Sequence, residues 1–186
     1  MSAKQLIESV ISEHVNVIQS LDTSVIEDMV EMVVDCYTTQ AKLILFGNGG
    51  SASDAQHITA EFVGRFVKER RPLPAISLGE NTSSLTAIGN DYGYDMVFRR
   101  QLEGLATRGD VVLAFSTSGN SPNVVKALEY AKEQELRTIG FMGKDGGVMK
   151  DIVDIGLVVP SNVTARIQEA HILIGHLICQ LVDDRL

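Results

Sequence analysis

Two histidines, one glutamate and one glutamine occur at spacings that could bring them together for chemistry. His57 and Glu61 are four residues apart, so on a helix they share one face, one turn apart. Gln168 and His176 are eight residues apart, which again places them on one side of a helix. Imidazole and oxygen donors without a thiolate suit zinc or a similar divalent ion, and a carboxylate with an imidazole can also transfer protons. The alternative is an ordinary helix surface, since such spacings arise freely by chance.

The other histidines and the two cysteines do not join this set. His171 and Glu169 point to another side of the C-terminal helix, and His14 lies on the opening helix, so we expect these three to be structural or solvated. Cys36 and Cys179 lie far apart in apolar, helix-like segments without a partner motif. We expect both to be reduced thiols that serve packing.

A glycine-rich loop precedes the His57 helix. Residues Gly47 to Asp54 read Gly-Asn-Gly-Gly-Ser-Ala-Ser-Asp, and the glycines allow close approach of the backbone to a ligand. Ser51 could cap the helix, with Asp54 three residues on, and the amides of a helix start favour an anion. A plain tight turn is the alternative. The loop is not a Rossmann fingerprint, because the G-x-G-x-x-G spacing is missing.

A second loop is rich in hydroxyls. Ser121 fits a helix N-cap and Pro122 the first helical position. Hydroxyls crowded at one helix start can bind the oxygens of a phosphate monoester; they belong to Ser116, Thr117, Ser118 and Ser121. The absence of G-x-x-x-x-G-K-[ST] argues against a nucleotide triphosphate. The later glycine-rich loop, Gly143 to Gly147, fits an ordinary turn and is interpreted as structural.

These loops belong to a pattern of alternating strands and helices. Short apolar runs predict buried parallel strands at Leu43–Phe46, Ala75–Leu78, Val111–Phe115, Thr138–Phe141 and Ile155–Val159. Helical spacing predicts helices at Leu6–Ile18, Val25–Cys36, Ser51–Phe66, Ser83–Gly89, Asp95–Ala106, Pro122–Gln134 and Thr164–Arg185. The pattern indicates a doubly wound α/β sheet, in which ligands bind beyond the carboxyl ends of the strands, where the strand order reverses.

Composition narrows the function further. With 186 residues, 45% of them apolar, the chain fits one domain over residues 1–186. A net charge of -8 argues against nucleic-acid binding, although a local positive pocket could still hold a small anion. The N-terminal stretch lacks the features of a signal peptide, and no window is long enough for a membrane span. We therefore expect a cytoplasmic protein that does not enter a membrane.

Four segments, in this order and spacing, resemble the phosphoheptose isomerases, also called sedoheptulose 7-phosphate isomerases, of the SIS superfamily: FGNGGSASDAQHITAEFVGRF, TAIGNDYGYD, AFSTSGNSPNVVKAL and TARIQEAHILIGHLI. The resemblance runs nearly end to end. It implies a SIS-type, flavodoxin-like sheet of five parallel strands preceded by two helices. It also implies an aldose-ketose isomerisation between sedoheptulose 7-phosphate and D-glycero-D-manno-heptose 7-phosphate, which supplies heptose for lipopolysaccharide, without a nucleotide or redox cofactor.

The resemblance also implies roles for individual residues. Substrate contacts are expected from Asn48, Gly49, Gly50, His57, Glu61, Asn90, Asp91 and Gln168, and from a phosphate cradle of Ser116, Thr117, Ser118 and Ser121. Glu61 and His176 match the acid-base pair of the family. The expected zinc ligands, one ion per subunit, are His57, Glu61, Gln168 and His176. The resemblance further implies a homotetramer, with residues 1–40 in a central bundle and the active sites between subunits. Ala165 replaces an acidic residue of some members.

Two other functions share this resemblance. The DnaA initiator-associating proteins are tetrameric SIS paralogues that bind the replication initiator and are not enzymes. They typically lack the glutamate and the second histidine that this chain retains as Glu61 and His176, which favours catalysis. The other alternative is a sugar-phosphate sensor, or an isomerase of hexose or pentose phosphates, that uses the same loops. The two opening helices and the full set of motifs favour the heptose branch.

Overall fold

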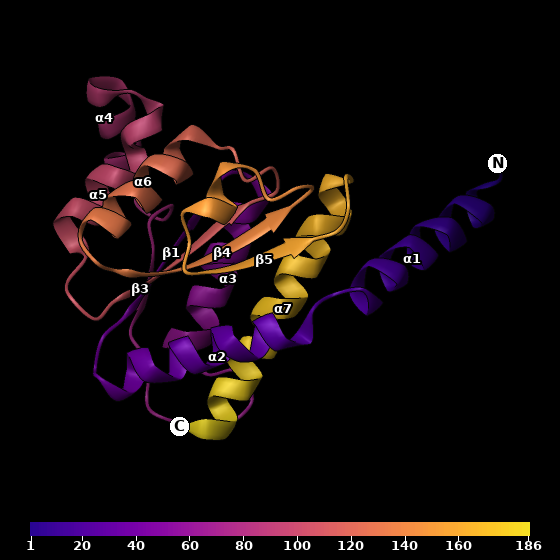
Figure 1. Cartoon of the computed structure of the whole chain (residues 1–186), viewed down its shortest axis with the longest axis horizontal. Coiled ribbons are helices and arrows are strands. Elements are labelled where there is room, and N and C mark those ends of the chain that lie inside the picture. Colours follow the sequence, from indigo (N-terminus) through magenta and orange to yellow (C-terminus); the bar gives the residue numbers. More distant parts are fainter.

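A central sheet of five parallel strands organises the molecule (Figure 1). The computed structural model describes all residues, Met1 to Leu186. The strands are β1 (Leu43–Gly47), β2 (Ala75–Ser77), β3 (Val111–Ser116), β4 (Arg137–Gly143) and β5 (Ile155–Val159). Their order across the sheet is β2-β1-β3-β4-β5, with every neighbouring pair parallel. The predicted doubly wound, flavodoxin-like sheet is confirmed.

Helices cover both faces of this sheet (Figure 1). The helices are α1 (Ala3–Gln19), α2 (Thr23–Thr38), α3 (Gly50–Val63), α4 (Thr82–Tyr92), α5 (Val97–Leu105), α6 (Pro122–Glu133) and α7 (Thr164–Arg185), with 3-10 turns η1 (Tyr94–Met96) and η2 (Val148–Asp151). Leu43 and Leu45 of β1 pack toward α2, α3 and α7, whereas Ile44 and Phe46 pack toward α5 and α6. Alternate strand residues point to opposite faces, so strands buried on both sides must be apolar throughout.

The two opening helices begin at side-chain caps. Ser2 and Gln5 form a reciprocal capping box at the start of α1, and the carboxylate of Asp22 accepts from the backbone amide of Ser24 at the start of α2. The α2 helix packs against the sheet, but Val17 is the only buried residue of α1. Consequently α1 projects away from the body of the molecule (Figure 1).

Several details of the predicted helices differ from the structure, among them the start of α1 at Ala3 and the end of α4 at Tyr92. Helix α3 starts at Gly50 after the N-cap residue Gly49, so Ser51 lies inside the helix and the predicted Ser51 cap is wrong. The helix starts earlier than predicted because Gly49 adopts a positive φ of 56° and takes the N-cap position in place of Ser51. Helix α3 also ends at Val63 and not at Phe66. The predicted helix from Asp95 is a short 3-10 turn that continues into α5.

No helix of the protein combines the length and apolar character that crossing a membrane requires.

Candidate active site

The two predicted ligand loops lie next to each other because β1 and β3 are neighbours in the sheet. Gly47, at the end of β1, pairs with Phe115 near the end of β3, and the strand order reverses at this point. The side chains of Asn48, in the first loop, and Asn123, in the first turn of α6, exchange two hydrogen bonds of 2.9 and 2.8 Å. The loops are therefore joined at the position where ligands bind in this class of sheet.

The hydroxyl-rich loop forms a cluster at the start of α6. The Ser116 and Ser121 hydroxyls are 2.9 Å apart, and the Ser116 and Ser118 hydroxyls are 3.5 Å apart. Ser121 is the N-cap residue, as predicted, but its hydroxyl makes no capping hydrogen bond to the helix. Pro122 has no N–H, and the amides of Val124 and Val125 already donate to the Ser121 carbonyl oxygen. The clustered hydroxyls are therefore the groups at this helix start that suit an anion.

The loop from Gly143 to Gly147 supports this cluster from behind. A Cβ atom on Gly119 would lie 1.9 Å from the Gly146 carbonyl oxygen, so only glycine fits there, at its φ of 64°. The side chain of Asn120 accepts a 3.0 Å hydrogen bond from the Val148 amide. The structural interpretation of this loop is consistent with these contacts.

Helices α3 and α7 run side by side along the same face of the sheet, and small residues set their spacing. A Cβ atom on Gly50 would lie 2.6 Å from the Gln168 amide nitrogen, and one on Gly175 would lie 2.6 Å from a methyl carbon of Ile58. Gly50 therefore faces Gln168. About two turns further along α3, His57 and Ile58 face the turn of α7 that carries Gly175 and His176.

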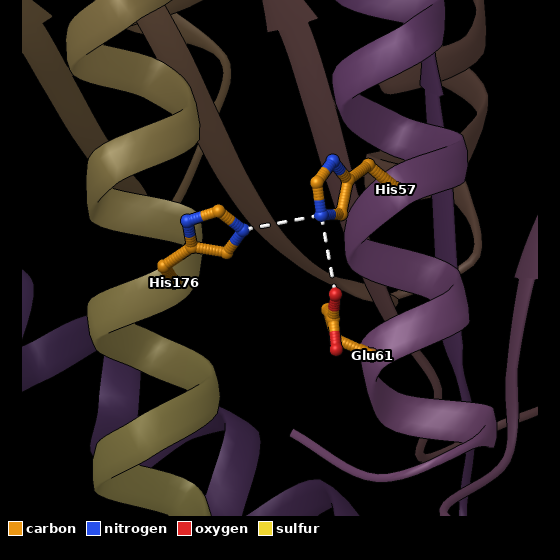
Figure 2. Close-up of side chains that lie close together, drawn as sticks. All are labelled: His57, Glu61 and His176. Atoms are coloured by element: carbon orange, nitrogen blue, oxygen red, sulfur yellow. Dashed lines mark hydrogen bonds and ion pairs between the residues drawn. The ribbon is translucent and has the colours of Figure 1, made fainter. Parts of the chain in front are cut away.

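His57, Glu61 and His176 form one cluster across these two helices (Figure 2). The Nε2 atom of His57 lies 3.1 Å from Oε1 of Glu61 and 3.2 Å from Nε2 of His176. All three ligand atoms lie within 4.8 Å of one another. The side chains of His57 and Glu61 are 50% and 24% exposed, so the cluster opens to the surface. The predicted pairing of two distant helices is thus present in the geometry.

His176 has an environment that keeps its imidazole neutral. Partial burial lowers the pKa of His176, the nearby His57 lowers it further, and Glu61 opposes both effects. The ring of Phe66 stacks against the His176 ring at 5.5 Å between centroids. A neutral imidazole is the form that can bind a metal ion or accept a proton.

The donor set fits a zinc ion. Bonds of about 2.0 to 2.1 Å at tetrahedral angles would put neighbouring ligand atoms about 3.3 Å apart. The observed separations of 3.1 and 3.2 Å around His57 are close to this value. Two imidazoles and one carboxylate are also the donor types that zinc accepts. Three ligands leave further positions open for a fourth side chain or for a substrate oxygen.

The fourth predicted ligand, Gln168, lies at a different level of α7. Its side-chain amide packs over Gly50 at the start of α3. Eight residues of helix separate Gln168 from His176, a rise of about 12 Å. The structure therefore brings Gln168 to the glycine-rich loop, and its role as a ligand stays a prediction.

Two predicted substrate contacts lie apart from the loops. Asn90 and Asp91 are exposed near the end of α4 and hydrogen-bond to each other at 2.8 Å, with no hydrogen bond to either loop. The link from this segment is Tyr94, whose hydroxyl donates to Oδ1 of Asn48 at 3.3 Å. The sequence analysis did not single out Tyr94 or Asn123. Their place inside recognised motifs was the only available signal, because neither contact is local in sequence.

The remaining polar candidates are structural. His14 and Glu169 pair with each other at 2.8 Å between α1 and α7, and His171 is fully buried. Cys36 and Cys179 are buried free thiols, as predicted, and burial raises the pKa of Cys36 to about 11.

A cavity of about 830 Å³ lies away from the cluster. It opens between α1 and the loops after β4 and β5, and its lining includes Ser12, Asn16, Lys144 and Ser161. No residue of the histidine and glutamate cluster lines it. Converging imidazole and carboxylate groups are more specific evidence for an active site than the size of a cavity. We therefore assign the candidate active site to the cluster and the two loops.

Comparison with known proteins identifies the family. Residues 8–143 match the SIS domain family. The chain is 60% identical over 151 residues to a phosphoheptose isomerase of Nitratiruptor sp., covering 81% of each chain. It is 60% identical over 161 residues to a phosphoheptose isomerase of Citrifermentans bemidjiense, covering 87% of this chain and 84% of that one.

Solved structures agree. The phosphoheptose isomerase of Neisseria gonorrhoeae superposes with a TM-score of 0.92 at 38% identity, over 98% of this chain and all of that one. The Francisella tularensis phosphoheptose isomerase gives a TM-score of 0.94 at 34% identity, over 99% and 100%. These relatives are named as isomerases, so the comparisons do not support the alternative of a DnaA-associating protein. The chain belongs to the phosphoheptose isomerases, a family of SIS-domain enzymes.

Proposed function

We propose that this chain interconverts sedoheptulose 7-phosphate and D-glycero-D-manno-heptose 7-phosphate in the cytoplasm, as a step toward surface heptoses such as those of lipopolysaccharide. The observation that carries the proposal is the cluster of His57, Glu61 and His176, in which a carboxylate and two imidazoles converge from two helices. A proton-transfer reaction needs such a set of groups. The family supplies the substrate class, a sugar phosphate.

The reaction moves a carbonyl group between neighbouring carbons. From the ketose, a base removes a proton from C1 while an acid protonates the carbonyl oxygen on C2, which gives an enediol. The base then returns the proton to C2 as the oxygen on C1 loses its own, so atoms and charge balance. Glu61 is the base, and His176 is the acid that exchanges protons with the two oxygens. Because its lowered pKa keeps His176 neutral, the proton that it gives and takes back is the N–H proton of a neutral imidazole.

The phosphate group positions the sugar. The hydroxyls at the start of α6 hold its oxygens, through Ser116, Thr117, Ser118 and Ser121. The glycine-rich loop, with Asn48, Gly49 and Gly50, contacts the sugar together with Asn90 and Asp91 of α4. Because the phosphate is bound at a distance from the reacting carbons, its binding energy serves to hold those carbons in a fixed orientation relative to the catalytic groups.

His57, Glu61 and His176 would hold one zinc ion per subunit. The predicted fourth ligand, Gln168, lies about 12 Å along α7 from His176, so it would have to come from a neighbouring subunit. Bound there, zinc would act as a Lewis acid toward the oxygens of the substrate. A carboxylate that is bound to a cation through both oxygens is a poor base. In Glu61, Oε1 faces His57, which leaves Oε2 for the proton (Figure 2).

The proposed assembly is a homotetramer with active sites between subunits. Helix α1 exposes four large apolar residues, Leu6, Ile7, Ile11 and Val15, which are between 42% and 59% exposed. An isolated helix surface of this kind favours burial against another copy of the chain. Residues 1–40 would then form a central bundle, and a neighbouring subunit would close the half-open cluster.

The test is to incubate the purified protein with sedoheptulose 7-phosphate and to follow the aldoheptose by NMR, before and after chelation and with zinc added back. Glu61→Gln should keep the fold and lose about a hundredfold or more in kcat. Glu129→Gln, a change at an exposed glutamate of α6, is the matched control and should retain normal rates. Absence of product under all conditions would refute the function. Near-normal turnover by Glu61→Gln would remove Glu61 from the chemistry.

A further inference from the structure

The side-chain amide of Asn123 has a fixed orientation. Its Oδ1 atom accepts a 3.0 Å hydrogen bond from the backbone amide of Val124. A backbone N–H can only donate, so the atom that faces it must be the oxygen of the carboxamide. Asn123 is only 3% exposed, so solvent does not compete for these bonds. The nitrogen of Asn123 therefore points to Asn48.

This orientation determines that of Asn48. Nδ2 of Asn123 donates to Oδ1 of Asn48 at 2.8 Å, and Nδ2 of Asn48 donates back to Oδ1 of Asn123 at 2.9 Å. A flipped Asn48 would place two donors against each other and two acceptors against each other. The hydroxyl of Tyr94 donates to the same Oδ1 of Asn48 at 3.3 Å. Both lone pairs of Asn48 are then used.

A single hydrogen-bonding position is left on this side chain. Of the two hydrogens on Nδ2 of Asn48, one bonds Asn123 and the other is free. We infer that Asn123 and Tyr94 are positioning residues, which present Asn48 to the substrate as a donor of one hydrogen bond and never as an acceptor. The partner is thus an oxygen lone pair of the ligand, on its phosphate, carbonyl or hydroxyl group.

The inference also explains why a buried asparagine lies directly behind the phosphate cradle. Asn123 follows Ser121 by two residues and reaches Asn48 across 75 residues of sequence. Any ligand held at the start of α6 therefore meets a first loop that is fixed relative to it. The same geometry predicts which ligands bind. A ligand that places only a hydrogen-bond donor against the free N–H of Asn48 is disfavoured, because two donors then face each other.

The first test uses the free protein and no substrate. In the 15N-labelled protein, one side-chain hydrogen of Asn48 should resist exchange with solvent deuterium and the other should exchange rapidly. Asn123→Leu should make both exchange rapidly. Equal exchange rates of the two hydrogens in the unaltered protein would overturn the inference, whatever the enzyme's activity.

The second test uses sedoheptulose 7-phosphate and rests on the proposed function. Tyr94→Phe removes one hydrogen bond at a side chain that is 58% exposed, so folding is not at risk. We expect KM to rise about three- to tenfold with kcat nearly unchanged, the effect of one lost hydrogen bond that orients a binding group. The matched control is Tyr92→Phe, which is 55% exposed and keeps its ring under Arg100.

The two tests separate the possible failures. A protein that does not isomerise the substrate refutes the proposed function, while the exchange measurement still decides the orientation of Asn48. Equal KM values for Tyr94→Phe and Tyr92→Phe would remove Tyr94 from the inference. Addition of substrate should shift the resonance of the free Asn48 hydrogen only, and a shift confined to the other hydrogen would contradict a donor role.

Discussion

His171 lies in the core beside the stacked rings of Phe115 and Phe141 and has no charge partner. Its ring contacts Phe115 and Phe141 edge-on, and its Nε2 atom lies 3.1 Å from the Met142 carbonyl oxygen, to which it donates. The Nδ1 atom is buried without a partner. Burial lowers the pKa of His171 to about 4, so the folded protein keeps this ring neutral across the neutral and mildly acidic range.

This burial predicts how stability depends on pH. The unfolded chain protonates His171 near pH 6.5, whereas the folded chain does so only near pH 4. The contribution of neutral His171 to the free energy of unfolding is therefore complete above pH 6.5. It falls by about 3 kcal/mol in total as the pH drops toward 4. Urea unfolding at several pH values should show the loss.

The matched comparison is between two histidine variants. His171→Leu should be less stable at pH 7 but should lose the part of the pH dependence that belongs to this ring. His14→Gln changes a half-exposed histidine of α1 and should retain it. An unchanged slope in His171→Leu between pH 6.5 and 5 would contradict the prediction.

At the scale of residues, the sequence predicted side chains that share one face of a helix. It did not predict the contacts between side chains from different loops. Spacing put His57 with Glu61 and Gln168 with His176, and the resemblance then assigned Glu61 and His176 the acid-base roles. The contacts of Asn123 and Tyr94 with Asn48 join segments 75 and 46 residues apart, which no spacing rule reveals. The predicted Ser51 cap was wrong because a positive φ at Gly49 moved the helix start.

At the scale of elements, a buried ion pair holds α3 against α7 near the active site. Nε of Arg70 donates to Oδ1 of Asp183 at 2.5 Å, with the two side chains 8% and 2% exposed. The guanidinium also donates to the carbonyl oxygens of Glu61 and Phe62 at the end of α3. The other Asp183 oxygen accepts from the amides of two loop residues, one of them Val67.

Asp183→Asn should destabilise the protein by about 3 kcal/mol, because it leaves a buried guanidinium without a counter-charge. Burial alone would raise the pKa of Asp183, but the hydrogen bond from Arg70 and those from the loop amides outweigh it and lower this pKa. The stabilisation is therefore present above the ordinary value of 3.8 and is lost as the pH falls below it.

A neighbouring residue gives the control for this prediction. Asp184 pairs with Lys68 at 2.6 Å, but both side chains are more than half exposed. Asp184→Asn should change the free energy of unfolding by about 1 kcal/mol or less. Equal losses for the two variants in denaturant titrations at pH 7 would show that the buried pair has no special role.

The same network explains which element boundary the sequence could not predict. Apolar periodicity placed all five strands and gave the bounds of α7 correctly, because burial on both faces dictates those patterns. It extended α3 to Phe66, whereas the helix ends at Val63. The helix ends at its C-cap residue Gly64, and Asp183, more than 100 residues away, binds the amides of Val67 and Lys68 in the loop that follows.

At the scale of the whole molecule, the helices differ in how much apolar surface they bury against the sheet. The helices α2, α3, α5, α6 and α7 bury apolar residues against the sheet, whereas α4 contributes only the partly buried Leu85 and Ile88. The sheet of five parallel strands that the resemblance implied is present. Helix α1 instead projects from the body and buries only Val17 (Figure 1). Its polar links to α7 are the pair of His14 and Glu169 and the ion pair of Glu13 and Arg166 at 3.7 Å, which sequence patterns could not reveal.

Ile11→Glu should break the assembly that we propose for α1. The side chain is 57% exposed in the single chain, so a charge there costs little in the monomer but opposes burial of α1 against another copy. Multi-angle light scattering after size exclusion should give a tetramer for the natural sequence and a smaller species for Ile11→Glu. Gln19→Glu, which adds the same charge at an exposed position on the last turn of α1, should leave the mass unchanged. If the active sites lie between subunits, the dissociated variant should also lose activity while its circular dichroism spectrum stays helical. A full tetramer with Ile11→Glu would mean that another surface joins the subunits.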